Sequence, residues 1–468
     1  MNADPEVPFP GAGPPPPLTP SPFPPDLPPP DGLSALVFPV QAYEQPPPLP
    51  PPPPPMPSGA VRRRRGRAVW LTVPVAGAVA FLATGWLVVE MREGPSLWPE
   101  PRPGVIVLPR YERPTVRHLH PDNGMTHLYG LDGVERPAEE LRAGAPPADV
   151  FRRTAAAREA WQRAAGSPRV AYLESLPPAD LSRFLGNVIA MASVEAARAG
   201  HLIDAGQIDD AFGVATNLLR NGAILSGGGP LAQVLVGWDV TESGLRVLRR
   251  LALAASDPAQ WEQLLSAAQA ARLDPSDALE ALRRDAAVLI ESPQPIYSSL
   301  FVPSQGRRGR PTAVGAVARR LFPILGSTPA TSQRHLFAAA TLWIAAADPA
   351  TAGPEADAAL ERFMAELRGP RIWLDDPLAA LLARACLASP RALRERMERA
   401  AAVAAATRGM LLVRRYEAVH GHPPASLAEA GIAASDADLT LTIHGREWRI
   451  RAGGVEVGPG EFAPSPRR

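Results

Sequence analysis

Lysine is absent from this chain of 468 residues, and cysteine occurs only once, as Cys386. A single thiol excludes an intramolecular disulfide and a cysteine-only metal cluster, so the fold has to be stabilised by packing. All 48 basic side chains are therefore arginine, and the chain has 47 acidic side chains. Because the two signs alternate along the chain and form no sustained basic surface, we expect no nucleic-acid partner.

Sequence signatures of catalysis are also missing. No G-x-S-x-G elbow and no G-x-G-x-x-G turn after a strand occurs, and the run Gly227–Gly229 is not followed by the Lys-Ser/Thr pair of a phosphate loop. The acidic pairs Asp209–Asp210 and Asp375–Asp376 come where helices are expected to start, so capping explains them. We therefore predict no catalytic residue, no cofactor and a non-enzymatic role.

Three histidines lie close together in the sequence, at His118, His120 and His127, with Asp122 between them. Imidazole and carboxylate ligands suit zinc, but the segment lacks the H-E-x-x-H spacing that directs two imidazoles of one helix at one ion. Solvated loop histidines are the simpler interpretation, so no metal site is predicted. The alternative of a metal at this cluster stays open.

Charge is missing altogether from Ala68–Val89, a run that directly follows the arginine-rich segment at 61–67. At about 1.5 Å per residue, a helix of this length spans roughly 33 Å, enough for a bilayer core of about 30 Å. Arginine is dense before the run and sparse after it, which by the positive-inside rule orients the N-terminus to the cytoplasm. Since the composition is typical of a high-GC bacterium, the sequence predicts a bacterial inner-membrane protein with its C-terminal body outside the cytoplasm.

The first 60 residues hold 25 of the 58 prolines and no basic residue, a composition that cannot bury enough apolar surface to fold. We predict a disordered cytoplasmic tail. An apolar island interrupts it, with Leu36, Val37, Phe38 and Tyr43 as candidate residues for binding a cytoplasmic protein. The alternative is that the island is incidental sequence in a spacer.

Changes of composition divide the rest of the chain. We predict a basic flank and transmembrane helix at 61–90, an irregular linker at 91–145, a helical domain at 146–432, a small β-meander at 433–460 and a tail at 461–468. Proline and glycine at 292–311 interrupt the helical pattern, either between two lobes or as a long surface loop.

Helix boundaries follow from a repeated sequence pattern, in which Asp, Ser or Thr precedes proline and apolar residues follow at spacings of three and four. The pairs are Asp257-Pro258, Asp274-Pro275, Thr328-Pro329, Asp376-Pro377 and Ser389-Pro390. Helices are predicted at 148–165, 178–199, 205–225, 230–254, 257–271, 275–291, 312–325, 329–347, 354–368, 376–387 and 390–420. Short connections favour antiparallel neighbours, so the predicted fold class is mainly α, a repeat-like stack of helical hairpins in which no fixed period recurs.

Alternation replaces the helical period near the C-terminus. Leu439, Leu441 and Ile443 alternate with polar residues, and two further short runs of the same kind end at Val457. This pattern predicts a three-stranded meander that packs on the last helix, because so small a sheet is marginal alone.

The segment from Tyr416 through Gly421 to Pro424 comes just before these strands. It resembles a helix-end stretch common in bacterial pseudopilins and in other bacterial single-pass membrane proteins. The resemblance is local and implies no assembly role. It implies that Gly421 takes a left-handed conformation and that the prolines after it stop the helix.

These patterns predict a single-pass protein whose helical extracytoplasmic domain binds or scaffolds another envelope protein, with the lipid bilayer as a further partner. Two alternatives stay open. One is a transmembrane regulator whose proline-rich tail docks a cytoplasmic protein. The other is an envelope hydrolase whose residues converge only in the fold.

Overall fold

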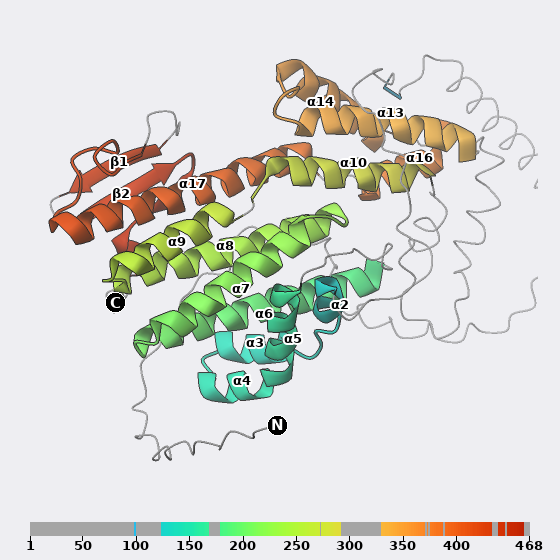
Figure 1. The fold of residues 1–468 in the computed structure, drawn as a ribbon. Helices are drawn as coiled ribbons and strands as arrows, with labels where there is room; N and C mark the ends of the chain where they lie inside the picture. The colour runs from blue at the N-terminus through green and yellow to red at the C-terminus, as the bar shows by residue number, and fades with distance from the viewer. Residues whose placement is uncertain are drawn as a thin grey trace, which may run out of the picture.

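A computed structural model describes a mainly helical protein with one small sheet, as the sequence predicts for these regions (Figure 1). The described residues are 98–99, 123–167, 178–271, 273–291, 329–369, 372, 375–386, 389–432, 439–444 and 447–462. The helices are α2 (Gly124–Tyr129), α3 (Glu135–Arg142), α4 (Pro147–Arg153), α5 (Ala155–Gly166), α6 (Pro178–Asp204), α7 (Ile208–Ser226), α8 (Leu231–Ala254), α9 (Pro258–Ala270), α10 (Pro275–Glu291), α13 (Pro329–Ala347), α14 (Pro354–Arg368), α16 (Pro377–Cys386) and α17 (Pro390–His420). The strands are β1 (Leu439–His444), β2 (Glu447–Ala452) and β3 (Val455–Val457), followed by the 3-10 helix η1 (Pro459–Phe462).

The membrane-spanning part of the predicted fold class needs correction. Among the helices of the described residues, none combines the length and the apolar character that crossing a bilayer requires. This finding contradicts the single-pass topology and the inner-membrane localisation predicted above. The run at 68–89 on which both rested lies outside the described residues, as do the tail at 1–60 and the helix predicted at 312–325.

Helix starts confirm the predicted caps at Asp257, Asp274, Asp376 and Ser389, whereas Thr328 lies outside the described residues. The Asp257 carboxylate accepts the backbone N–H of Ala259 at 3.0 Å, and the Asp274 carboxylate accepts that of Ser276 at 2.9 Å. Ser389 caps α17 in the same way. A side-chain acceptor satisfies an N–H that the first turn leaves free, and the proline after it has the backbone angle of a helix, so the boundary is set locally.

Two short helices occupy part of the stretch predicted as an irregular linker at 91–145. Asn123 begins α2 by accepting the N–H of Met125 at 3.2 Å, and buried apolar residues of α2 and α3 join the main core. The helix predicted at 148–165 is divided into α4 and α5 at Thr154, whose hydroxyl donates to the carbonyl of Val150 at 2.9 Å. Such side-chain bonds to the backbone compete with helix propagation.

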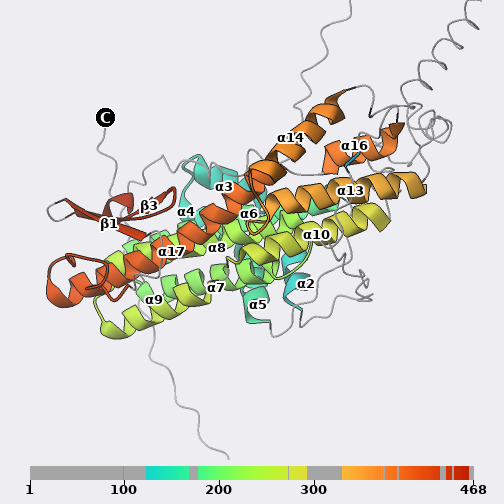
Figure 2. The same ribbon diagram turned by 90° about the horizontal axis from the view of Figure 1, so that it is seen from above.

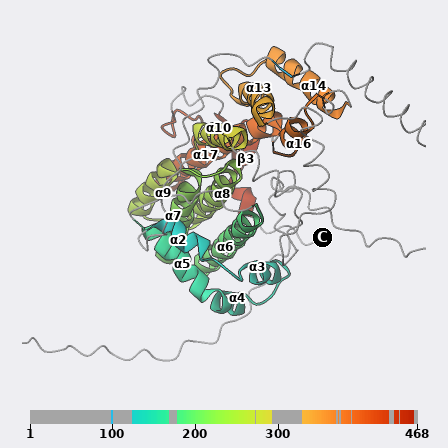
Figure 3. The same cartoon turned by 90° about the vertical axis from the view of Figure 1, so that its right-hand side faces the viewer.

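Helices α6, α7 and α8 form the centre of the molecule, with α2–α5 against α6 and α7 (Figures 1 and 3). Backbones approach closely where α7 crosses α8. A Cβ added to Gly222 would lie 2.8 Å from the carbonyl oxygen of Gly237. A Cβ added to Gly237 would lie 2.8 Å from the carbonyl oxygen of Gly222. Only glycine permits this contact, so the crossing depends on residues without side chains.

Helix α17 runs along the molecule and joins its parts (Figure 2). Its 31 residues extend over about 46 Å, and it contacts α8, α9, α10 and α13 as well as the sheet. Gly421 ends it with a left-handed φ of 75°, and its N–H donates to the Glu417 carbonyl at 2.8 Å. The helix stop predicted for this position is confirmed, whereas the pseudopilin resemblance stays a prediction.

The three strands form an antiparallel meander of order β1-β2-β3. Leu441 of β1 is opposite Ile450 of β2, and Ile450 is opposite Val457 of β3. Along β2, exposed and buried side chains alternate, and the buried ones pack with Met410 and Val413 of α17 in a small core of their own. The predicted meander and its packing on the last helix are therefore confirmed.

Candidate functional site

Strand β1 forms one edge of the sheet. It pairs with β2 on one side, and no other strand of the described part of the chain pairs with it. An edge strand presents a row of backbone N–H and C=O groups that a further strand can bind. With six residues, β1 is twice as long as β3, the opposite edge. The longer edge is therefore the better template for a further strand.

The residues of β1 include none of those that commonly block a strand edge. Thr440 and Thr442 are exposed on the outer face, whereas Leu439, Leu441 and Ile443 are half-buried and pack against the small core. Natural proteins usually block an edge with charged residues, proline or a bulge, and the sequence LTLTIH has neither proline nor an acidic or arginine residue. This strand has the composition of one that accepts a partner.

The rest of the outer face is charged. Exposed Arg449 and Arg451 of β2 lie opposite the two threonines of β1, and Arg449 pairs with exposed Glu456 of β3 at 2.7 Å. A charged outer face keeps water there and disfavours stacking of another apolar sheet on it. The edge of β1, rather than the face of the sheet, is therefore the candidate binding surface.

Polar contacts fix the sheet and the 3-10 helix η1 after it to the helices. The indole N–H of Trp448 donates to Glu417 of α17 at 3.1 Å. Arg249 of α8 is 4% exposed, donates to the two Glu461 carboxylate oxygens at 2.9 and 2.7 Å and also donates to Thr407 of α17 at 2.8 Å. A bidentate, charge-assisted pair of this kind fixes orientation as well as distance. The edge of β1 is thus presented on a rigid base.

A serine, a histidine and an aspartate meet between α13 and the start of α16. Asp376 is fully buried; its carboxylate accepts the Ser332 hydroxyl at 2.9 Å and the N–H of Ala379 at 3.0 Å, and His335 Nδ1 lies 2.9 Å from it. A serine nucleophile needs a base that takes its proton, usually the imidazole itself. Here the fully buried Ser332 donates to the carboxylate, so the arrangement caps α16 and ties it to α13.

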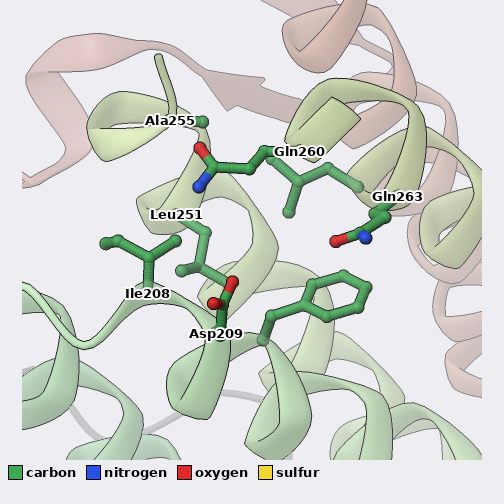
Figure 4. Close-up of a pocket in the computed structure, with 8 residues that line it drawn as sticks. Ile208, Asp209, Leu251, Ala255, Gln260 and Gln263 are labelled. Atoms are coloured by element: carbon green, nitrogen blue, oxygen red, sulfur yellow. The ribbon is translucent and has the colours of Figure 1, made fainter. Parts of the chain in front are cut away.

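A shallow depression lies between α7, α8 and α9, where Ile208, Phe212, Leu251 and Gln260 line it together with Asp209 (Figure 4). Its volume is about 240 Å³, including space open to solvent. Ligand pockets usually enclose 300–1,000 Å³ with several convergent polar groups. Among the described residues that line it, Asp209 is the only one with a charged side chain, so the depression suits neither a drug-sized ligand nor acid–base chemistry.

Among the described residues, the titratable groups whose pKa burial shifts do not converge on one place either. Burial raises the pKa of Asp285 on α10 to about 7, raises that of Tyr129 on α2 to about 12 and raises that of Glu195 on α6. Burial also lowers the pKa of Arg396 on α17 to about 10. Catalytic sites bring such groups together. These four belong to four different helices, and helix packing explains each of them.

The predicted site residues fall largely outside the described residues. This applies to Leu36, Val37, Phe38 and Tyr43, and to His118 and His120 of the histidine cluster. His127 lies in α2 and is half-buried. Within the described ranges, no three side chains among His, Cys, Asp and Glu are grouped so as to hold a metal ion. The edge of β1 was signalled in the sequence by its alternation, although alternation does not reveal which strand lies at an edge.

Comparison with known proteins adds no further constraint, because no family model, curated protein or solved structure matches the chain.

Proposed function

We propose that the described part of the chain is a binding module, a helical scaffold that takes up an extended segment of a partner protein as an additional strand along β1. The observation that carries the proposal is the six-residue edge of β1, with which no further strand of the described part of the chain pairs and whose apolar side chains lie half-buried over the core of the sheet. Strand addition obtains affinity from main-chain hydrogen bonds and specificity from alternate side chains.

The arrangement of the sheet specifies the chemistry of the partner segment. Alternate residues of an added strand point toward α17 and continue the row made by Leu439, Leu441 and Ile443, so they should be apolar. The intervening residues lie on the outer face beside Thr440 and Thr442, where small polar side chains fit. The best partner is therefore a short alternating segment without proline.

The sequence of β1 itself meets this description and supplies a probe. The peptide Leu-Thr-Leu-Thr-Ile-His can pair antiparallel with β1 so that its second leucine lies opposite Leu441. Its residues equivalent to Ile443 and Thr442 then lie opposite Leu439 and Thr440. Apolar residues then face apolar ones on the inner side throughout. We expect the full chain to bind a fluorescent form of this peptide, measured by anisotropy, and backbone amides of β1 to become protected from hydrogen exchange.

Two lysine variants distinguish strand addition from nonspecific binding of the peptide. In Leu441→Lys the charge points inward at the edge, a device that natural edge strands use against pairing, so peptide binding should fall at least tenfold. In Thr442→Lys the same charge lies on the outer face, and binding should change little. Equal binding by both variants, or protection of amides elsewhere than in β1, would contradict the proposal.

A further inference from the structure

Two exposed imidazoles lie side by side at the C-terminal end of α17. His420 is the last residue of the helix, His422 follows Gly421, and their ring centres are 6.2 Å apart. Neither ring packs in the core, and neither takes part in the candidate binding surface described above. The pair is therefore free to bind a ligand independently of the sheet.

Backbone carbonyls orient both rings. Nδ1 of His420 lies 2.9 Å from the Tyr416 carbonyl oxygen, and Nδ1 of His422 lies 3.0 Å from that of Pro423. A carbonyl only accepts, so each Nδ1 carries the hydrogen, and in the neutral imidazole each Nε2 keeps its lone pair. Metal-binding histidines are usually held in this way, with one nitrogen donating to a carbonyl or carboxylate and the other facing the metal.

The surroundings favour a cation. The last carbonyls of a helix carry partial negative charge, which stabilises positive charge within the final turn. Tyr416 stacks on His420 with ring centres 3.9 Å apart and planes 19° apart, and it meets the ring of His422 edge-on at 5.8 Å. The imidazole of His420 is therefore held by both the carbonyl and the ring of Tyr416, so it loses less conformational entropy when it binds an ion.

We propose that Nε2 of His420 and Nε2 of His422 bind one divalent transition-metal ion, with water in the remaining coordination positions. At a metal–nitrogen distance of about 2.0–2.1 Å and a tetrahedral angle, two imidazole centres lie about 5 Å apart. The two ring centres are now 6.2 Å apart, and rotation of the two exposed side chains can bring them to this distance. Among first-row ions, Cu²⁺ binds imidazole sites most tightly and is followed by Ni²⁺ and Zn²⁺.

Titration of the full chain with Cu²⁺ tests the site, with Zn²⁺ as the weaker comparison. We expect His420→Gln and His422→Gln each to lower the affinity of one copper equivalent at least tenfold, and the double variant to remove that equivalent. Both residues are exposed, so the variants should retain the helical circular-dichroism spectrum. Electron paramagnetic resonance of the copper complex should show nitrogen coupling from two imidazoles.

The histidines near residue 120 supply the control. The variant His118→Gln/His120→Gln should keep the copper equivalent assigned to α17. If that variant loses the equivalent while the His420→Gln/His422→Gln variant keeps it, or if the nitrogen coupling is unchanged in the latter, the proposal is wrong.

Discussion

The crossing of α7 with α8 and the attachment of α17 to α8 show two different ways of joining helices. Gly222 and Gly237 let the backbones of α7 and α8 come into contact, so a side chain added at either glycine meets backbone atoms that cannot move aside. In contrast, α17 is held to α8 by long arginine side chains, with Arg396 paired to Asp239 and near Glu242. The contact of α7 with α8 depends on backbone shape, whereas the contact of α17 with α8 depends on paired charges. A substitution should therefore cost most at the glycines.

The largest effect is expected for Gly237→Ala. The new Cβ would lie 2.7 Å from the backbone nitrogen of Ser226, 2.8 Å from the carbonyl oxygen of Gly222 and 2.9 Å from the Cβ of Leu225. None of these atoms is the end of a flexible side chain, so the helices must move apart. We expect the free energy of unfolding to fall by about 3 kcal/mol, measured by urea denaturation.

Gly213→Ala is the matched control in α7. A Cβ added to Gly213 meets no atom within 4 Å, and alanine is the better helix former. The variant should be as stable as the parent or more stable by up to about 1 kcal/mol. If alanine at Gly213 and alanine at Gly237 lowered the free energy of unfolding equally, the close crossing of α7 and α8 would not explain the effect.

An intermediate effect is expected where α10 meets the start of α8. The Asp285 carboxylate accepts the N–H of Leu231 at 2.9 Å, and burial raises its pKa from 3.8 to about 7. Between pH 4 and pH 7 the folded state therefore holds a proton that the unfolded state has lost. The free energy of unfolding falls as the pH rises through this window, and the lost stability returns when the pH is lowered.

The variant Asp285→Asn should remove this pH dependence, because asparagine is uncharged and keeps an oxygen that can accept the Leu231 N–H. Asp285 is half-buried, so we expect a gain of about 2 kcal/mol at pH 8 and none at pH 4. Urea denaturation at both pH values measures it. Asp209→Asn, at an exposed position in the first turn of α7, should show no such gain.

Most helix boundaries could be predicted because their causes are local. Asp257 and Ser389 each satisfy an N–H of the next turn, and the following proline restricts the backbone wherever the chain lies. Helix α2 was missed because Asn123 caps it without a proline and its six residues are too few to show a period. The division at Thr154 was missed because a hydroxyl bond to the backbone leaves the apolar pattern unchanged.

The candidate sites were less predictable because they depend on tertiary pairing and on ring orientation. The alternation of Leu439, Leu441 and Ile443 predicts a strand, but the edge position of β1 follows from the order of the sheet. Ser332 and Asp376 are 44 residues apart, so only the fold brings them together. His420 and His422 are two residues apart in the sequence, yet the carbonyls that orient their rings are visible only in the structure.

The smallest effect is expected where arginine pairs hold the parts together, and burial decides its size. Arg249 is 4% exposed and joins Glu461 to Thr407, so Arg249→Gln should lower the free energy of unfolding by about 1.5 kcal/mol, the lower end of the range for a hydrogen bond to a charged group. The side chain of Arg399 is 51% exposed and lies 3.4 Å from Glu242, so Arg399→Gln should cost less than about 0.5 kcal/mol. Thermal denaturation at low and high salt distinguishes them, because salt screens an exposed pair more than a buried one. If both variants lose the same stability, burial does not set the strength of these joints, and the contrast with the glycine crossing would then rest on shape alone.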